Sequence, residues 1–354
     1  MKIASIVGAR PQFIKCAPLS REMRKEHEEV LIHTGQHYDH EMSDIFFEEL
    51  GIPEPDYNLR IGSGNHGEQT GEMLIEIEKV FLKEKPDIVL VYGDTNSTIA
   101  GALAASKLHI RVAHVEAGLR SFDRAMPEEI NRILTDHVSD LLLCPTQTAI
   151  NNLANEGIIE SVHLVGDVMV EALEYNRKVS EEKSKIIEEL RLEKGKYLVI
   201  TVHRPSNTDS KKNMSNIIEA LSKSGKVIVF LVHPRTEKYL REYKLWDNMH
   251  ANVRLMPPLG YLDMLKLLGN AEKILTDSGG IQKEAYILKV PCITLRENTE
   301  WVETLADGWN VLVGADREKI IKALNEFKPQ NKQKCLFGGG DTSVRITKVL
   351  GGLG

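Results

Sequence analysis

One stretch predicts the fold most directly: Ile274-Leu-Thr-Asp-Ser-Gly-Gly-Ile-Gln-Lys-Glu-Ala285. Its apolar start predicts a strand that ends near Thr276, and the turn that follows leads into a helix that Ser278 can cap. The two glycines would let a ligand approach the backbone, and the free N–H groups of a first helical turn favour an anion such as phosphate. An ordinary strand-to-helix connection explains Asp-Ser-Gly-Gly equally well.

Glu284 favours the nucleotide interpretation of this stretch. It lies about one turn into the predicted helix, where a carboxylate can accept hydrogen bonds from ribose hydroxyl groups. A phosphate site beside a ribose site indicates a nucleotide.

Strand patterns alternate with helical patterns through both halves of the chain, which is typical of an α/β protein with parallel, doubly wound sheets. The predicted strands are residues 3–7, 30–33, 88–92, 112–115 and 141–144, then 198–202, 227–232, 253–256, 274–276 and 292–295. The charged stretch 180–196 indicates a domain boundary. We therefore expect Rossmann-like domains at 1–166 and 197–340, a linker helix at 167–196, and a C-terminal helix at 341–354 that returns to the first domain.

The bulk properties exclude several classes of protein. A chain of 354 residues exceeds the usual size of one hydrophobic core. A net charge of -6 with both signs interspersed argues against nucleic-acid binding. Because no apolar run is long enough to span a membrane and the first residues predict a strand, we expect a cytoplasmic protein. The cysteines Cys16, Cys144, Cys292 and Cys335 form no CxxC pair, so we expect buried thiols and neither a zinc site nor a disulfide framework.

Three acidic residues of the first half are candidates for catalysis. Asp94 and Glu116 follow predicted strands, and Glu129 lies in the first turn of a predicted helix. Active sites of such sheets lie beyond the carboxyl ends of the strands, where Asp94 and Glu116 are expected. A helix cap would also explain Asp94, and the helix dipole would also explain Glu129. Glu116 has few structural explanations, since it ends an apolar strand. Three carboxylates in one crevice would repel one another and raise the pKa of at least one, which makes a proton donor near neutral pH.

Candidate anion-binding groups follow strands in both halves. Gly8-Ala-Arg10-Pro-Gln-Phe-Ile-Lys15 predicts a glycine turn and a helix start, with Arg10 and Lys15 at its mouth. A solvated helix position is the alternative for Lys15. His203 and His233 end two adjacent strands, each beside an arginine, and the pair could bind a diphosphate without a metal. A lone histidine of this kind is more often a core group.

These motifs occur in order along nearly the whole chain and together resemble the non-hydrolysing UDP-N-acetylglucosamine 2-epimerases. The motifs that carry the resemblance are Gly8-Ala-Arg-Pro-Gln-Phe-Ile-Lys15, Thr34-Gly-Gln-His37, Gly93-Asp-Thr95, His114-Val-Glu-Ala-Gly-Leu-Arg120, Pro127-Glu-Glu-Ile-Asn-Arg132, Val202-His-Arg204, Asp277-Ser-Gly-Gly-Ile-Gln-Lys-Glu-Ala285 and Gly339-Gly-Asp341.

The resemblance implies two Rossmann-like domains that face each other across a cleft, as in the GT-B glycosyltransferases, with a UDP-sugar between them. It implies interconversion of UDP-N-acetylglucosamine and UDP-N-acetylmannosamine by a homodimer, without cofactor or metal. The implied mechanism is elimination of UDP to 2-acetamidoglucal, followed by re-addition.

The resemblance also assigns roles to individual residues. It assigns proton transfer to Asp94, Glu116 and Glu129, and an essential position near the diphosphate to His203. It assigns nucleotide binding to Arg10, Lys15, His233, Ser278, Gly279, Gly280 and Glu284. Met264 stands where an apolar side chain often meets the uracil, although this helix pattern would also serve as plain core.

Three departures from the family pattern bear on function. Val202-His-Arg-Pro-Ser-Asn207 stands where many bacterial relatives have Thr-His-Arg-Arg-Glu-Asn. Trp301 replaces the arginine of their Thr-Glu-Arg-Pro-Glu motif, so the ligand contact of that arginine is either lost or supplied elsewhere, for which Arg296 is the candidate. Some bacterial members bind a second UDP-N-acetylglucosamine as an activator through an arginine where this chain has Glu68. An acid there would repel a diphosphate, so we do not expect that activation.

Three other functions are alternatives to a non-hydrolysing epimerase. A GT-B glycosyltransferase shares the fold and the donor but needs only one general base. A hydrolysing 2-epimerase would release free N-acetylmannosamine. A sensor of UDP-sugars would gain nothing from burying Asp94, Glu116 and Glu129.

Overall fold

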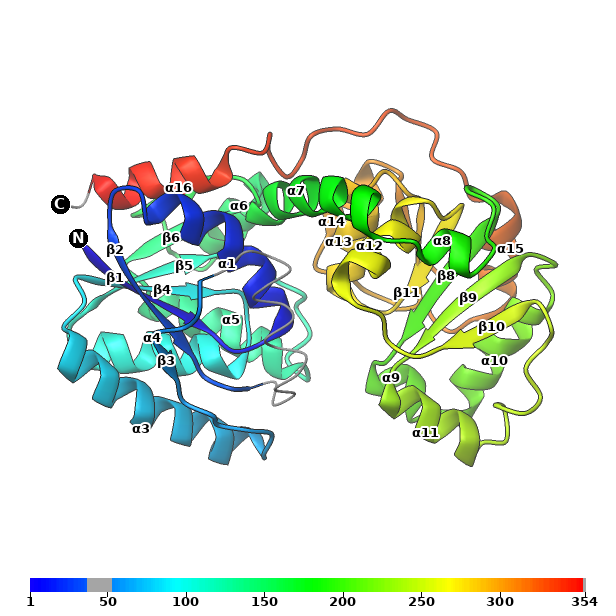
Figure 1. Cartoon of the computed structure of the whole chain (residues 1–354), viewed down its shortest axis with the longest axis horizontal. Coiled ribbons are helices and arrows are strands. Elements are labelled where there is room, and N and C mark those ends of the chain that lie inside the picture. The colour runs from blue at the N-terminus through cyan, green and yellow to red at the C-terminus, as the bar shows by residue number, and fades with distance from the viewer. Residues whose placement is uncertain (37–52, 353–354) are drawn as a thin grey trace. The chain divides into compact units, whose positions relative to one another are not determined.

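The computed structural model describes residues 1–36 and 53–352, apart from the Arg10 side chain, and these residues form two compact units (Figure 1). Unit 1 comprises Met1–Glu174 and Cys335–Gly354, and unit 2 comprises Tyr175–Lys334. His37 of the Thr34-Gly-Gln-His motif lies outside the described residues. No helix in the described ranges has the length and apolar character that crossing a membrane requires.

Unit 1 is built on a parallel sheet whose described strands pair in the order β3-β2-β1-β4-β5-β6-β7. The strands are β1 (Lys2–Val7), β2 (Glu28–His33), β3 (Tyr57–Asn58), β4 (Ile88–Tyr92), β5 (Arg111–Val115), β6 (Leu141–Cys144) and β7 (Val162–Leu164). The inner strands β1, β4 and β6 are almost wholly buried, as expected of parallel strands covered by helices on both faces.

Helices cover both faces of this sheet. The described helices that begin in unit 1 are α1 (Arg10–Met23), α3 (His66–Glu84), α4 (Asn96–Lys107), α5 (Pro127–Val138), α6 (Gln147–Asn155), α7 (Val168–Lys183) and α16 (Thr342–Gly351). α1 packs against α16 on one face, and α4 packs between α3 and α5 on the other (Figure 1). The C-terminal helix thus completes the unit that contains the first strand.

Unit 2 repeats the architecture with the strand order β10-β9-β8-β11-β12-β13. Its strands are β8 (Tyr197–Val202), β9 (Val227–Val232), β10 (Val253–Met256), β11 (Lys273–Thr276), β12 (Cys292–Thr294) and β13 (Asn310–Leu312). Its helices are α8 (Ile186–Glu189), α9 (Pro205–Thr208), α10 (Lys211–Ser222), α11 (Pro234–Glu242), α12 (Tyr261–Gly269), α13 (Gly279–Ile287), α14 (Val302–Ala306) and α15 (Arg317–Glu326).

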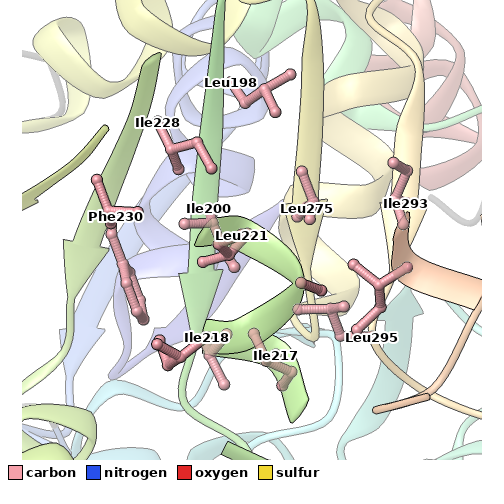
Figure 2. Close-up of a cluster of buried hydrophobic side chains, with 14 of the residues drawn as sticks. Leu198, Ile200, Ile217, Ile218, Leu221, Ile228, Phe230, Leu275, Ile293 and Leu295 are labelled. Atoms are coloured by element: carbon pink, nitrogen blue, oxygen red, sulfur yellow. The ribbon is translucent and has the colours of Figure 1, made fainter. Parts of the chain in front are cut away.

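An apolar layer between this second sheet and α10 holds unit 2 together (Figure 2). Ile217, Ile218 and Leu221 project from α10 towards Ile200 and Phe230 of the sheet, and all five are buried (Figure 2). Burial of side chains of this size is the main favourable contribution to folding.

The α/β class and every predicted strand are confirmed, with ends that differ by at most two residues. β3, β7 and β13 were missed. Each lies at an edge of its sheet, has two or three residues and is partly exposed, so none forms a continuous apolar run. The expected buried thiols are confirmed for Cys16, Cys144 and Cys292, whereas Cys335 is exposed.

Gly118 shows how closely the connection after β5 approaches its neighbour. It has a φ of +79°, and a Cβ added there would lie 2.4 Å from the carbonyl oxygen of Ala149 in α6. Gly157, which follows α6, has a similar φ of +82° but has no described atom within 4 Å of such a Cβ. Substitutions at the two glycines therefore distinguish the cost of a left-handed backbone from the cost of a close contact.

We predict that Gly157→Ala lowers the free energy of unfolding by about 1 kcal/mol, the cost of a left-handed backbone without glycine. Gly118→Ala should cost at least about 3 kcal/mol, because the methyl group also overlaps a backbone oxygen. Urea unfolding followed by circular dichroism measures both values. Equal losses would show that the approach to Ala149 is unimportant.

Candidate active site

Two of the three candidate acids of unit 1 share one arginine. Asp94 follows β4, and Glu129 lies in the first turn of α5. Arg132, one turn further along α5, donates to Asp94 Oδ2 from Nη2 at 2.7 Å and to Glu129 Oε2 from Nη1 at 2.6 Å. Only 5% of the Arg132 side chain and 1% of the Glu129 side chain are exposed. A buried cation thus joins two carboxylates.

Backbone donors complete the surroundings of Glu129. The N–H groups of Ser121 and Phe122 donate to its two oxygens at 2.9 and 2.8 Å. Burial raises the pKa of Glu129, but these N–H groups and the charge of Arg132 outweigh it, so the pKa lies below its ordinary value. Crowding is expected to raise the pKa of at least one of the three acids, and Glu129 is not that acid, since its partners hold it ionised.

Glu116 pairs with Lys15 in the same unit. The Lys15 ammonium group, at the end of the second turn of α1, donates to Glu116 Oε2, and both side chains are buried. A Cβ added to Gly93 would lie 3.2 Å from Lys15 Nζ and 3.4 Å from Glu116 Oε2. Because Gly93 precedes Asp94, this ion pair lies beside the Asp94 loop. The structure therefore brings the three candidate acids and Lys15 together at the carboxyl ends of β4 and β5.

The strand ends of unit 2 are organised by Asp277, which follows β11 and is wholly buried. Its carboxylate accepts from the N–H groups of His203 and Arg204 at 3.0 Å, and from Asn207 Nδ2 at 3.0 Å. His203 Nδ1 lies 3.5 Å from Asp277 Oδ1. Asp277 therefore orients the loop that carries His203.

His203 and His233 lie at adjacent strand ends, as expected, with ring centroids 5.9 Å apart. His233 caps α11, and its Nδ1 accepts from the N–H group of Arg235 at 3.2 Å. Burial and the charge of Arg235 lower the pKa of His233, although Asp277 opposes the shift. His233 is accordingly neutral at pH 7 and carries its proton on Nε2, which makes Nε2 a donor.

The N-terminus of α13 agrees with the predicted turn. Ser278 is the N-cap and accepts from the N–H group of Ile281, and Gly280 is exposed. A Cβ added to Gly279 would lie 1.8 Å from Glu300 Oε1, so only glycine fits there without displacing that acid. Arg296 in turn donates to Glu300 Oε2 at 3.0 Å.

The remaining candidates occupy separate positions. Glu284 is buried in α13, and Met264 is half-buried in α12. Arg10 begins α1, but its side chain lies outside the described part of the structure. Trp301, which stands where many bacterial relatives have an arginine, is buried. The Lys283 ammonium group lies 4.4 Å from the centre of its ring, so Trp301 makes a cation–π contact at this position.

Sequence reasoning missed Arg132, Asp277 and Asn207. The spacing of Glu129 and Arg132, three residues apart on one helix, was a signal for an ion pair. Asp277 ends an apolar strand and met the criterion that identified Glu116. Asn207 had no signal, because its contact crosses 70 residues of sequence. No three acidic, histidine or cysteine side chains are placed to hold a metal in the part of the chain that the structure describes.

The chain is similar in sequence and fold to known proteins over nearly its whole length. The family model described as UDP-N-acetylglucosamine 2-epimerase matches residues 21–351. The chain is 61% identical to a UDP-N-acetylglucosamine 2-epimerase homolog of Methanococcus maripaludis, over 99% of each chain. It is 48% identical to the UDP-2,3-diacetamido-2,3-dideoxy-D-glucuronate 2-epimerase of Pseudomonas aeruginosa, again over 99% of each chain. The crystal structure of Methanocaldococcus jannaschii UDP-GlcNAc 2-epimerase in complex with UDP-GlcNAc and UDP matches with 51% identity and a TM-score of 0.92 over 99% of each chain.

We predict that Arg132→Met lowers the free energy of unfolding at pH 7 by about 3–5 kcal/mol, because it leaves Glu129 as a buried charge without its cation. The deficit should shrink below about pH 4, since a carboxyl group that becomes protonated no longer needs that cation. Urea unfolding at pH 7 and at pH 3 measures it.

The control for this prediction is Arg317→Met, which removes an arginine from the exposed ion pair with Glu219. This variant should unfold at nearly the wild-type urea concentration, because exposed pairs contribute little. A pH-independent deficit in Arg132→Met would contradict the assignment of an ionised Glu129.

Proposed function

The chain belongs to the UDP-N-acetylglucosamine 2-epimerase family of enzymes, and from this premise we propose that it interconverts UDP-N-acetylglucosamine and UDP-N-acetylmannosamine. The observation that carries the proposal is the group of three carboxylates in unit 1, each placed against a buried cation. A protein that only binds UDP-sugars has no use for such a group, because burial of charge is costly.

We propose that the reaction proceeds by elimination and re-addition of UDP. A carboxylate removes the proton from C2, the C1–O bond breaks, and its electron pair leaves with the β-phosphate oxygen of UDP. The product is 2-acetamidoglucal. A carboxyl group then protonates C2 on the opposite face while the UDP oxygen attacks C1 again. The carbon skeleton is neither oxidised nor reduced overall, so no hydride carrier is required.

The carboxylates suit the two halves of this cycle. Inversion at C2 needs one group that takes a proton on one face and another that returns it on the other face. Glu129, held ionised by Arg132, can accept a proton. The Lys15 ammonium group donates a hydrogen bond to Glu116. A proton can move along this bond, so the pair can supply the proton that returns to C2. We assign proton transfer to Asp94, Glu116 and Glu129 together.

Unit 2 supplies the proposed nucleotide site. The leaving diphosphate gains negative charge as C1–O breaks, and N–H donors and cations aimed at it stabilise the transition state. His203, the Nε2–H group of His233 and the N-terminus of α13 at Ser278, Gly279 and Gly280 are such donors. We assign further nucleotide contacts to Arg10, Lys15, Met264, Glu284 and Arg296.

A related substrate is the second candidate. The relative from Pseudomonas aeruginosa, 48% identical to this chain, is a 2-epimerase of UDP-2,3-diacetamido-2,3-dideoxy-D-glucuronate. That sugar shares the 2-acetamido group and the UDP leaving group, so the same elimination would apply. It differs at C3, where an acetamido group replaces the hydroxyl group, and at C6, where a carboxylate replaces the hydroxymethyl group.

We predict that the purified protein converts UDP-N-acetylglucosamine to UDP-N-acetylmannosamine without added metal or nicotinamide. Anion-exchange chromatography of the nucleotide sugars measures the products. Asp94→Asn, Glu116→Gln and Glu129→Gln should each lower kcat by about 10²- to 10⁴-fold, the usual contribution of one acid–base group.

The matched control is Glu318→Gln, at an exposed position of α15, which should leave the rate unchanged. Free N-acetylmannosamine with UDP would indicate the hydrolysing reaction instead. Turnover of the diacetamido-glucuronate alone would establish the second candidate.

We further propose that two chains form a homodimer through the α3–α4–α5 layer of unit 1. Ile75 and Leu82 on α3 are 54% and 58% exposed, and Ile130 and Leu134 on α5 are 42% and 49% exposed. Each pair lies on one face of its helix, and α4 packs between the two helices. An exposed set of large apolar side chains of this kind is typical of a protein interface.

We predict that the wild-type protein sediments as a species with twice the chain mass of 39.8 kDa. The double variant Leu82→Asp with Leu134→Asp should sediment as a folded monomer. Ile159→Asp, at a position that is 74% exposed after α6, is the control and should leave the dimer intact. A wild-type monomer in analytical ultracentrifugation would contradict the proposed interface.

A further inference from the structure

His114 is a buried histidine whose two ring nitrogens both face acceptors. It lies in β5 and is 0% exposed. Its Nε2 lies 2.8 Å from the carbonyl oxygen of Gly93, and its Nδ1 lies 2.7 Å from Asp136 Oδ1. A carbonyl oxygen only accepts hydrogen bonds, so Nε2 must carry a proton.

The second proton follows from the surroundings of Asp136. Its Oδ2 accepts from the N–H group of Gly118 at 3.1 Å and from Arg120 Nη1 at 2.7 Å. Burial raises the pKa of Asp136, yet the pKa is lowered overall, and the guanidinium group of Arg120 and the N–H group of Gly118 favour the ionised carboxylate independently of His114. Asp136 is therefore ionised and can only accept. His114 must donate from Nδ1 as well, which makes the ring a cationic imidazolium.

The charges around His114 balance one another, and all of them except that of Glu156 are buried. Arg120 donates to both oxygens of Glu156, from Nε at 2.6 Å and from Nη2 at 2.7 Å. Two cations, His114 and Arg120, thus face two anions, Asp136 and Glu156. A balanced, hydrogen-bonded network of this kind can remain charged in the interior.

This network connects the strand ends that carry two of the proposed acids. Gly93, whose carbonyl oxygen accepts from His114, immediately precedes Asp94 at the end of β4. His114 is itself two residues before Glu116 at the end of β5. The imidazolium therefore fixes the two strand ends relative to each other at the point where Asp94 and Glu116 leave the sheet.

The other hydrogen bond of His114 reaches the helix that carries the third acid. Asp136 lies in α5, four residues after Arg132 and seven after Glu129. These spacings place the three side chains along one side of the helix. The bond from His114 to Asp136 thus holds α5, with its Glu129–Arg132 pair, against β5.

We propose that His114 is a positioning residue for the epimerase reaction: as an imidazolium it holds the three elements that carry Asp94, Glu116 and Glu129 in one arrangement. This inference rests on the proposed function, since it assigns proton transfer to those acids. His114 does not itself exchange a proton with the sugar, because both of its ring nitrogens are occupied by protein acceptors.

The protonation state is testable without any enzyme assay. In protein that carries ¹⁵N-labelled histidine, two-bond ¹H–¹⁵N spectra at pH 7.5 distinguish protonated from unprotonated ring nitrogens, and loss of a signal in His114→Gln identifies His114. We expect both nitrogens of His114 to be protonated. An unprotonated nitrogen would overturn the inference, whether or not the protein proves to be an epimerase.

A pair of variants tests the positioning role. Asn places its amide nitrogen near the position of histidine Nδ1, and Gln places its own near Nε2, so His114→Gln keeps a donor for Gly93 whereas His114→Asn loses it. We expect His114→Asn to lower kcat about 100-fold, the effect of misplacing catalytic groups by about 1 Å, with KM near the wild-type value. His114→Gln should recover about tenfold of that loss, which corresponds to one buried hydrogen bond.

The same two substitutions at His163 are the control. His163 lies in the edge strand β7, outside the network, and both variants should keep the wild-type kcat. A folded His114→Asn variant with the wild-type kcat, or equal losses in both His114 variants, would overturn the inference. If both variants unfold, the ¹⁵N spectrum of the wild-type protein decides, with the ring of His114 assigned through its own backbone resonances.

Discussion

The pairing of buried charge is the constraint on which the structure of unit 1 depends. A carboxylate can be kept ionised away from water only where cations and N–H donors replace its hydration. Arg132 does so for Glu129 and also pairs with the partly exposed Asp94, and Lys15 pairs with Glu116. Cations of the protein itself therefore hold the three acids to which we assign proton transfer.

Unit 2 also surrounds a buried carboxylate with hydrogen-bond donors of the protein. Asp277 is wholly buried, and its oxygens receive the N–H groups of the loop after β8 together with Asn207. The Asp277 carboxylate is thus engaged by groups of unit 2 itself, beside His203, His233 and the start of α13, which we propose as donors to an anion. This difference supports the proposed division of roles, in which unit 1 transfers protons and unit 2 binds the diphosphate.

The sequence predicts the buried strands well, because runs such as 88–92 and 198–202 are continuously apolar, whereas the edge strands β3 and β13 have no such run. It also places Asp94 and Glu116 at strand ends. It does not reveal their partners, since Lys15 and Glu116 are 101 residues apart and only the strand order brings them together. For that reason crowding alone predicts a raised pKa for at least one of the three acids, whereas the partners of Glu129 lower its pKa.

The proton-transfer account is tested most directly by the fate of the hydrogen at C2. UDP-N-acetylglucosamine is incubated with the wild-type protein in deuterated water and followed by proton nuclear magnetic resonance. The account predicts UDP-N-acetylmannosamine that carries deuterium at C2, and deuterium at C2 of the remaining substrate as the reaction reverses. UDP-N-acetylmannosamine that keeps its original hydrogen at C2 would contradict it, because inversion would then have occurred without exchange through the carboxylates.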